Sequence, residues 1–184
     1  MENENIKQAV QYLKQGKIIA YPTEAVYGLG CDPYNETALK NLLKLKQRSW
    51  KKGLILIASD YKQLEPFLQS LTPELKDKVF ASWPGAITWL LPAKIGVSHY
   101  LRGSSYKLAV RVTAHPQTVI LCQQWGKALV STSANISATP AAITSLQVQH
   151  ELGDKIDYLL PGQVGELQRP SEIRDALTDE VLRN

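Results

Sequence analysis

Short apolar segments that suit β-strands alternate along this chain with segments whose apolar residues recur at helical spacing. Apolar residues between Ile6 and Leu13 share one face of a helix that Gly16 should end, and a strand over residues 17–21 follows. Residues 54–58 are apolar at every position, which is typical of a strand covered on both faces. Strands that alternate with helices predict an α/β fold.

The same patterns assign much of the remaining chain. Strands are predicted over residues 87–91, 108–112, 128–131 and 156–160, and helices over 36–47, 115–125 and 143–152, with two more beginning after Asp60 and after Thr72-Pro73. The stretch between residues 87 and 112 has no obvious crossover helix, so part of the sheet should be antiparallel. We expect residues 1–184 to form a single domain in which helices flank a twisted, mixed parallel and antiparallel sheet.

The composition leaves the class of partner open. A formal net charge of +4 and a pI near 9.0 suit a polyanion such as a nucleotide or RNA without requiring one. Cys31 and Cys122 lie far apart and the histidines are scattered, so we predict reduced packing thiols and neither a metal site nor a tightly bound cofactor. Residues 1–5 are polar and acidic, and no apolar run approaches the ~20 residues that cross a bilayer. We therefore expect a cytoplasmic protein without membrane insertion.

Glycine-based phosphate-binding motifs are missing from the sequence. The pattern GxxxxGK[ST] is absent, and Gly28 and Gly30 are followed by Pro33 where GxGxxG requires its third glycine. If this chain binds a nucleotide, side chains in loops must therefore hold the phosphates.

One candidate loop is residues 46–53, which read KQRSWKKG and end in a buried strand. In a continuous helix Lys46 and Arg48 would point about 200° apart, so a joint phosphate site requires the helix to end near Lys46. A purely structural role is the alternative, because cations at the C-terminus of a helix interact favourably with its dipole, by about 0.3–1 kcal/mol.

The second candidate is residues 131–137, which read STSANIS directly after an apolar strand. Open α/β sheets bind ligands beyond the carboxyl ends of their strands, and hydroxyl and amide groups can donate to phosphate oxygens. Ser131 and Ser133 would share a face if this segment stays extended. An ordinary polar turn leading into a helix is the alternative.

Five segments in sequential order resemble the YrdC family of threonylcarbamoyl-AMP synthases. Residues 21–30 read YPTEAVYGLG and are similar to the signature PTExxYGLG. The KxR motif is matched by Lys46-Gln47-Arg48, and the SxN motif by Ser133-Ala134-Asn135. Two further family segments are matched by Arg111, ahead of His115-Pro116, and by residues 171–175 (SEIRD). The resemblance runs from about residue 16 to residue 177 and is strongest to the short, single-domain bacterial form. Ser49 and Gly53 stand where many relatives have proline, which predicts a more mobile loop around Lys52.

The resemblance implies an open, concave, basic site and a reaction among ATP, L-threonine and bicarbonate or CO2. The threonine amine takes up the one-carbon unit as a carbamate, which attacks the α-phosphate of ATP to give L-threonylcarbamoyladenylate and pyrophosphate. The product serves the threonylcarbamoyl modification of tRNA adenosine 37, next to the anticodon. The resemblance also implies that proteins of the TsaD, TsaB and TsaE type complete the transfer, and it leaves open whether tRNA binds this chain directly.

By the same resemblance, Lys46 and Arg48 are the catalytic residues and bind the phosphates of ATP together with Lys52. Ser133 and Asn135 bind the nucleotide from the opposite wall. Mg²⁺ travels with the ATP phosphates, because the sequence has no acidic cluster that would form a protein cage.

The threonine ligands implied by the resemblance are Thr23, Arg111, Ser131 and Ser171. Arg111 fixes the carboxylate, and Ser131 lies between nucleotide and amino acid. Two structural alternatives stay open, since Arg111 in an apolar strand can be a paired structural arginine and Thr23 can simply begin a turn after Pro22.

Two other functions are weighed against the synthase. The first is a non-catalytic module that binds tRNA or double-stranded RNA through phosphate contacts, with an affinity that falls steeply as salt rises. The second is a regulatory protein that binds a small ligand and has lost catalysis. The chain has no RNA-binding signature, and its intact KxR and SxN motifs favour the enzyme.

Overall fold

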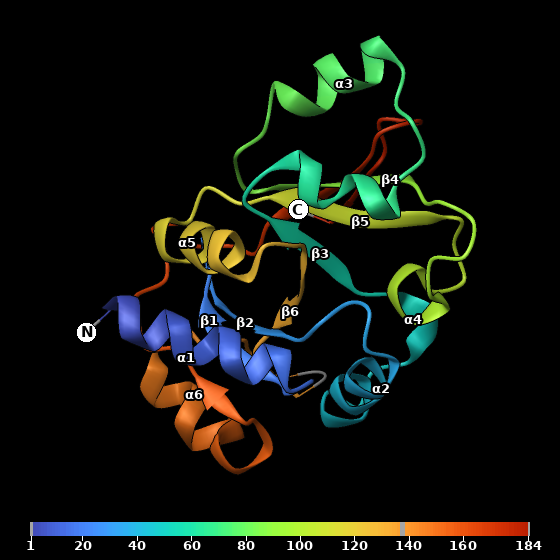
Figure 1. Cartoon of the computed structure of the whole chain (residues 1–184). Helices are drawn as coiled ribbons and strands as arrows, with labels where there is room; N and C mark the ends of the chain where they lie inside the picture. Colours follow the sequence, from blue (N-terminus) through green and yellow to red (C-terminus); the bar gives the residue numbers. More distant parts are fainter. Residues whose placement is uncertain (1, 137–138, 184) are drawn as a thin grey trace.

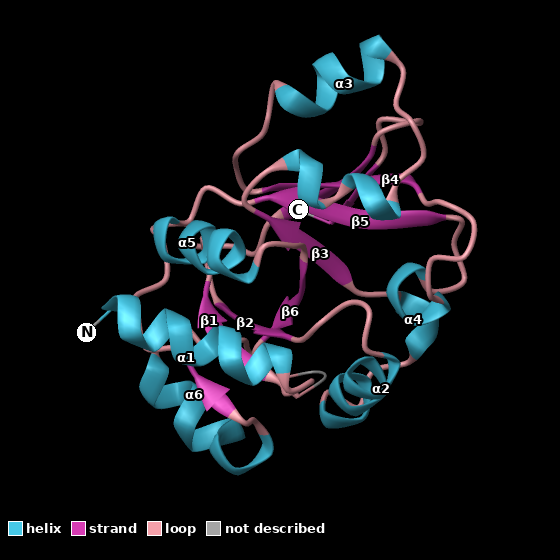
Figure 2. Ribbon diagram, viewed as in Figure 1, coloured by secondary structure: helices cyan, strands magenta, loops and turns pink. Residues whose placement is uncertain are grey.

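A mixed sheet organises the parts of the chain that the computed structural model describes, residues 2–136 and 139–183. The strands are β1 (Ile19–Pro22), β2 (Tyr27–Gly30), β3 (Ile55–Ala58), β4 (Ile87–Pro92), β5 (Lys107–Val112), β6 (Leu129–Ser133), β7 (Tyr158–Leu159), β8 (Glu172–Asp175) and β9 (Val181–Arg183), in the order β7-β1-β2-β6-β3-β5-β4-β8-β9. The pairs β1–β7, β3–β5 and β4–β8 are parallel and the other neighbours are antiparallel, which confirms the predicted mixed sheet (Figures 1 and 2).

Helices flank this sheet, and side-chain caps explain where several of them begin. They are α1 (Glu2–Lys14), α2 (Glu36–Leu45), α3 (Pro73–Phe80), α4 (His99–Arg102), α5 (Pro116–Trp125) and α6 (Ser145–Leu152). Asn35 caps α2 by accepting from the amide of Ala38, Thr72 caps α3, and Thr144 forms a capping box with Gln147 at α6. None of the described helices is long and apolar enough to cross a membrane.

The two faces of the sheet are buried in different ways. One face packs against α2 and α6 in a large apolar cluster that includes Leu29, Leu56, Val110 and Val130. On the opposite face, α1 and α5 lie side by side and cover a smaller cluster that includes Ile57 and Leu129 (Figure 1). The rest of this second face forms the floor of a pocket.

One predicted helix is wrong. The segment after Asp60 forms two short 3₁₀ turns, Tyr61–Gln63 and Glu65–Phe67, in place of an α-helix. Asp60 caps the first turn as expected, by accepting from the amide of Lys62 at 2.8 Å. Pro66 explains the interruption, because proline lacks the amide that a continuing α-helix needs and clashes with the preceding turn.

The other predicted elements are confirmed within a few residues of their ends. The short helix α4 and the strands β2, β8 and β9 were not predicted. Strand β2 contains Gly28 and Gly30, and glycine is depleted in strands, so its sequence reads as a loop. Strand β9 is three residues long, and its apolar residues Val181 and Leu182 are 45% and 50% exposed, so it lacks the pattern of a buried strand.

Candidate active site

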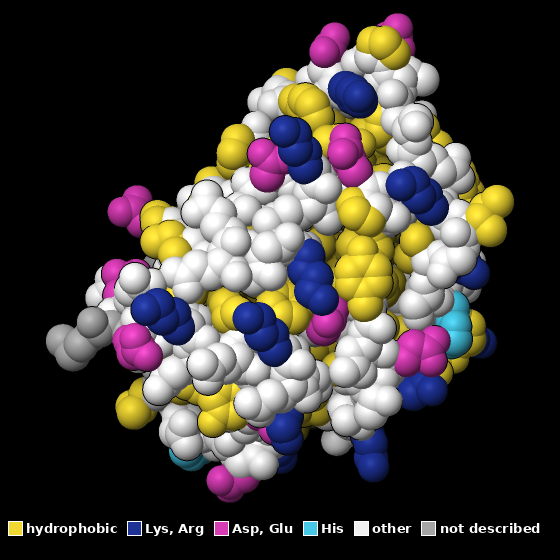
Figure 3. All heavy atoms as spheres, viewed as in Figure 1, with side chains coloured by type: hydrophobic (Ala, Val, Ile, Leu, Met, Phe, Trp, Pro, Cys, Tyr) yellow, Lys and Arg dark blue, Asp and Glu magenta, His cyan; other side chains and the backbone are white. Residues whose placement is uncertain are grey.

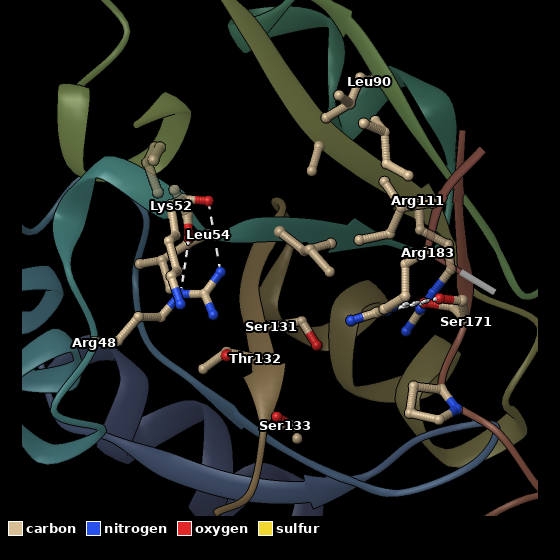
Figure 4. Close-up of a pocket in the computed structure, with 18 of the residues that line it drawn as sticks. Arg48, Lys52, Leu54, Leu90, Arg111, Ser131, Thr132, Ser133, Ser171 and Arg183 are labelled. Atoms are coloured by element: carbon tan, nitrogen blue, oxygen red, sulfur yellow. Dashed lines mark hydrogen bonds between the residues drawn. The ribbon is translucent and has the colours of Figure 1, made fainter. Parts of the chain in front are cut away.

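The pocket lies on the open part of the sheet face that α1 and α5 cover elsewhere, and has a volume of about 340 Å³. Its floor comes from alternate residues of neighbouring strands, because successive side chains of a strand point to opposite faces. These residues include Ser131 and Ser133 of β6, Ala109 and Arg111 of β5, Leu90 of β4 and Ile173 of β8. Figure 4 shows Arg48 and Lys52 on one side of the pocket, Arg111, Ser171 and Arg183 on the other, and the serines of β6 between them.

The basic loop, residues 46–53, begins where α2 ends. The helix stops at Leu45, Lys46 is its C-cap, and Gln47 has a φ of 49°, so the chain leaves helical geometry here. The helix predicted over residues 36–47 thus ends two residues early, and the helix end near Lys46 that a joint site requires is present. The Arg48 side chain points into the pocket and donates from Nε to the carbonyl of Gly53 at 3.2 Å (Figure 4).

Lys46 lies behind the pocket wall, and only 2% of its surface is exposed. Its Nζ donates to the carbonyl of Ser133 at 2.5 Å, and to the carbonyl and Oδ1 of Asn135, both at 2.8 Å. Burial, followed by the positive charge of Arg48, lowers the pKa of this ammonium to about 8. The KxR and SxN motifs thus meet through Lys46, and in this arrangement the lysine holds the turn that follows β6. Its predicted contact with a phosphate stays a prediction.

The SxN segment continues the floor of the pocket. Ser131 and Ser133 line the same cavity from one face of β6, which confirms the prediction that they share a face. Ser133 donates from Oγ to Oδ1 of Asn135 at 2.7 Å, and Nδ2 of the Asn135 side chain donates to the carbonyl of Thr139. Asn135 therefore shapes the turn beside the pocket. Ser137, at the end of this candidate loop, lies outside the described residues.

The residues that replace proline in the basic loop have defined structural roles. Ser49 begins the 3₁₀ turn Trp50–Lys52 by accepting from the amide of Lys51 at 3.4 Å. Gly53 has a φ of 63°, and a Cβ at this position would lie 2.6 Å from the carbonyl oxygen of Leu101. Proline, whose φ is fixed near −65°, does not fit this backbone. The next amide, Leu54, donates to the carbonyl of Leu101 at 2.8 Å, so the loop is tied to α4. The predicted mobility of the loop stays a prediction.

Arg111 is buried in β5 and faces the pocket. Its NH2 lies 3.3 Å from Oε2 of Glu24, and its NH1 donates to Oγ1 of Thr88 at 3.5 Å. Among the described residues, neither Nε of Arg111 nor Oε2 of Glu24 has a hydrogen-bond partner. Arg111 is thus a paired arginine that also lines the cavity. Thr23 combines two roles as well, because it lines the pocket and donates from Oγ1 to the carbonyl of Val26 at 2.6 Å, in the turn after Pro22.

Ser171 lines the far wall, where sequence reasoning missed a third arginine. The NH2 of Arg183 donates to the carbonyl of Ser171 at 2.6 Å and lies 3.2 Å from its Oγ, which is also 3.1 Å from Oγ1 of Thr88. Although Arg183 as a whole is exposed, its guanidinium is partly desolvated where it contacts Ser171, and this desolvation, followed by the positive charges of Arg111 and Arg48, lowers its pKa. The segment around Arg183 is short and exposed, so the sequence carried little signal for it.

The electrostatic character of the pocket favours anions. Its lining includes seven cationic residues, Arg48, Lys51, Lys52, Arg102, Lys107, Arg111 and Arg183, of which Lys107 is paired with Asp175. Glu24 is the one acidic residue among the described residues that line it. By contrast, the face drawn in Figure 3 mixes basic and acidic side chains without gathering either. The described parts of the chain contain no group of three or more His, Cys, Asp or Glu residues placed to hold a metal ion.

Comparisons with known proteins cover nearly the whole chain. The model of the Sua5, YciO and YrdC family, described as telomere recombination, matches residues 11–184. Threonylcarbamoyl-AMP synthase of Vibrio vulnificus (strain YJ016) is 51% identical over 181 residues, which are 97% of this chain and 97% of that protein. The structure of P. abyssi Sua5 complexed with L-threonine is similar with a TM-score of 0.89 and 29% identity, over 95% of this chain and 52% of that chain. E. coli YciO, at 24% identity, has the same fold with a TM-score of 0.86 over 98% of this chain and 89% of that chain.

Proposed function

This chain belongs to the Sua5, YciO and YrdC family, and from that premise we propose that it is a threonylcarbamoyl-AMP synthase. The enzyme condenses L-threonine, bicarbonate or CO2 and ATP to L-threonylcarbamoyladenylate and pyrophosphate. The observation that carries the proposal is one cavity in which Arg48 and Lys52 face Arg111 and Arg183 across the serines of β6 (Figure 4). This arrangement suits a polyphosphate and a carboxylate held side by side.

The amino-acid substrate occupies the side of Arg111 in this proposal. The guanidinium of Arg111 binds the threonine carboxylate, and the hydroxyls of Thr23, Ser131 and Ser171 order the rest of the molecule. L-threonine is bound by P. abyssi Sua5, which shares this fold. A guanidinium is well suited to this task, because its parallel N–H groups match the two oxygens of a carboxylate.

ATP occupies the side of the basic loop. Arg48 and Lys52 bind its phosphates, with Mg²⁺ carried by the phosphates, and Ser133 and Asn135 bind the nucleotide from the wall of β6. We assign Lys46 a catalytic part together with Arg48. Its contacts support a role in holding the Ser133–Asn135 turn, and they place its charge directly behind that wall.

The chemistry proceeds by positioning and charge stabilisation, without a protein nucleophile. The threonine amine attacks the carbon of the one-carbon unit and forms an N–C bond while it gives up a proton. With CO2, one C=O π bond becomes the carbamate C–O⁻ and the proton passes to solvent; with bicarbonate, a C–O bond breaks and the hydroxide leaves with that proton as water. An oxygen of the resulting carbamate then attacks the α-phosphorus of ATP, and the bond from that phosphorus to the bridging oxygen of the β-phosphate breaks. Pyrophosphate leaves with the bonding electrons, and nearby cations stabilise the charge that develops on the phosphate oxygens.

In the cell, the product would pass to proteins of the TsaD, TsaB and TsaE type, which transfer the threonylcarbamoyl group to tRNA. We place this step in the cytoplasm, where tRNA is modified. Direct binding of tRNA to this chain would fit the basic rim of the pocket.

Pyrophosphate release from ATP tests the proposed function. Purified protein is assayed with threonine and bicarbonate each present or omitted, and we expect release only when both are present. No release from folded protein that still binds ATP would favour a ligand-binding protein without catalysis. Binding of tRNA without binding of ATP would favour the RNA-binding module.

A further inference from the structure

Glu24 is held on the pocket wall by contacts on both its side chain and its backbone. Its Oε1 accepts from Oγ1 of Thr113 at 2.7 Å and from the amide of Ala114 at 3.2 Å. Its carbonyl accepts from the amide of Leu167 at 3.2 Å, and a Cβ at Gly165 would lie 2.6 Å from that same oxygen. The carboxylate therefore has one well-defined position.

The second carboxylate oxygen of Glu24 faces Arg111. Its Oε2 forms an ion pair with NH2 of Arg111 at 3.3 Å, while neither this oxygen nor Nε of Arg111 has a hydrogen-bond partner within the part of the chain that the structure describes. Only 9% of Glu24 and 5% of Arg111 is exposed. A buried ion pair in which Nε of Arg111 has no acceptor among the described residues compensates only part of its desolvation cost, so stability alone does not explain this arrangement.

The other side of the Arg111 guanidinium is bounded by hydroxyl groups. NH1 donates to Oγ1 of Thr88 at 3.5 Å, and that oxygen lies 3.1 Å from Oγ of Ser171. Glu24 thus contacts one terminal nitrogen of the guanidinium and Thr88 contacts the other. Thr23 and Ser171 line the same pocket as Arg111.

We propose that Glu24 is a positioning residue for the amino-acid substrate: its carboxylate fixes the plane of the Arg111 guanidinium so that the remaining N–H groups meet the substrate carboxylate. This inference rests on the proposed function, and it assigns to the acidic residue of the pocket a role in threonine binding. Glu24 also balances the charge of Arg111 while the amino-acid site is empty. Its effect is confined to the amino-acid half of the reaction, because the contacts of Arg48 and Lys52 do not involve it.

The test compares Glu24→Gln with the wild type. Glutamine keeps the shape of the side chain and removes its charge. We expect the KM for threonine to rise about 10- to 100-fold, the loss expected when a charge-assisted hydrogen bond to a carboxylate is misaligned. The KM for ATP, and kcat at saturating threonine, should change less than about threefold because the nucleotide side is intact. Glu24→Asp keeps the charge and should recover part of the threonine affinity.

Asp157→Asn is a matched control for the loss of a structural carboxylate. Asp157 accepts from the amide of Ile18 at 2.9 Å and pairs with Lys17 at 3.2 Å, away from the residues that line the pocket. Removing its charge should lower the melting temperature without changing the KM for threonine. A parallel shift in the KM for threonine in this control would mean that general destabilisation explains the Glu24 result.

A double-mutant cycle with Arg111→Gln tests whether Glu24 acts through Arg111. In the Arg111→Gln background, Glu24→Gln should produce no further loss of threonine binding. A full additional loss, or a Glu24→Gln enzyme with an unchanged KM for threonine, would overturn the inference. If Glu24→Gln does not fold, Thr113→Val is used instead, because it removes the hydroxyl that donates to Oε1 of Glu24. We then expect a smaller rise in the KM for threonine. An unchanged KM for threonine would overturn the inference.

Calorimetric titration with L-threonine separates this inference from the proposed function. Wild-type protein that binds threonine but releases no pyrophosphate contradicts the synthase, and the Glu24→Gln titration still decides the role of Glu24. Wild-type protein that releases pyrophosphate, with equal threonine affinity in wild type and Glu24→Gln, contradicts only the role of Glu24. If wild type neither binds threonine nor releases pyrophosphate, both proposals fail.

Discussion

Two halves of one sheet face differ sharply in what their side chains do. Under α1 and α5, Ile57 of β3 and Leu129 of β6 are completely buried among apolar neighbours. Two residues away along the same strands and on the same face, Ile55 and Ser131 line the pocket. The strands continue without a break from one half to the other, so the presence of a covering helix decides where apolar burial gives way to polar contacts. The covered half supplies stability, and the open half supplies chemistry.

The largest effect is expected from the open half. Arg48→Ala removes a cation that points into the pocket and whose side chain donates to the carbonyls of Gly53 and Lys52. We expect turnover to fall about 10²–10³-fold, the usual loss for one charge-stabilising donor. The free energy of unfolding should change by less than about 1 kcal/mol, since no buried packing is lost. Pyrophosphate release measures the turnover, and urea denaturation measures the free energy of unfolding. A large loss of stability would contradict the division of the sheet face into a stabilising half and a catalytic half.

The covered half should show the reverse pattern. Leu129→Ala leaves a cavity under α1 and α5, and we expect it to lower the free energy of unfolding by about 2–5 kcal/mol. At a temperature where the protein stays folded, its KM values should match those of the wild type.

Ser131→Ala, two residues along the same strand, is the matched control for Leu129→Ala. Urea denaturation should show little change for this variant, while the kinetics of pyrophosphate release should show the loss of a pocket hydroxyl. If Ser131→Ala proved as destabilising as Leu129→Ala, the division of the sheet face into two roles would be wrong.

Gly53→Ala tests how the basic loop is kept in place. Gly53 has a φ of 63° and a ψ of −179°, a conformation that is essentially restricted to glycine, and a Cβ would press against the Leu101 carbonyl. Strain of this kind costs about 1–3 kcal/mol, and we expect it to displace the loop and to raise the KM for ATP more than the KM for threonine.

Gly126→Ala provides the control for Gly53→Ala, because Gly126 also has a positive φ but a Cβ there would meet nothing within 4 Å. Steady-state kinetics of both variants measure the effect. Equal changes in the KM for ATP would show that the contact with Leu101 does not position the loop.

The smallest effect concerns the charge of Lys46, which connects the loop to β6. Burial lowers the pKa of Lys46 from its usual 10.5 to about 8. Between pH 8 and pH 10.5 the unfolded chain therefore binds this proton more readily than the folded protein does. The free energy of unfolding should consequently rise with pH across this range. Turnover should instead decline as Lys46 loses its charge, by about 10-fold between pH 7 and pH 9 relative to Lys46→Arg. Dividing the turnover of the wild type by that of Lys46→Arg at each pH removes the effect of the titrating threonine amine, because both enzymes use the same substrate. A constant ratio up to pH 10 would mean that the three oxygens around Nζ keep the proton in place.

Local patterns predicted the elements that the chain builds from neighbouring residues. The apolar face of α1 and the buried strand β3 follow directly from their sequence periodicity. The KxR and SxN motifs identified both loops at the pocket. Contacts between distant segments could not be predicted in the same way. The contact from Lys46 to Ser133 joins residues 87 apart, and the pairing of Arg111 with Glu24 depends on how β5 packs against the turn after β1. Arg183 reaches the site only because β9 pairs with β8.

The most direct test of the account is to identify the product. Purified protein is incubated with ATP, L-threonine and ¹³C-labelled bicarbonate, and the products are analysed by mass spectrometry beside reactions from which each substrate is omitted. We expect threonylcarbamoyl-AMP that carries one ¹³C atom and forms only when all three substrates are present. ATP that binds to the folded protein but yields no labelled adenylate would contradict the synthase.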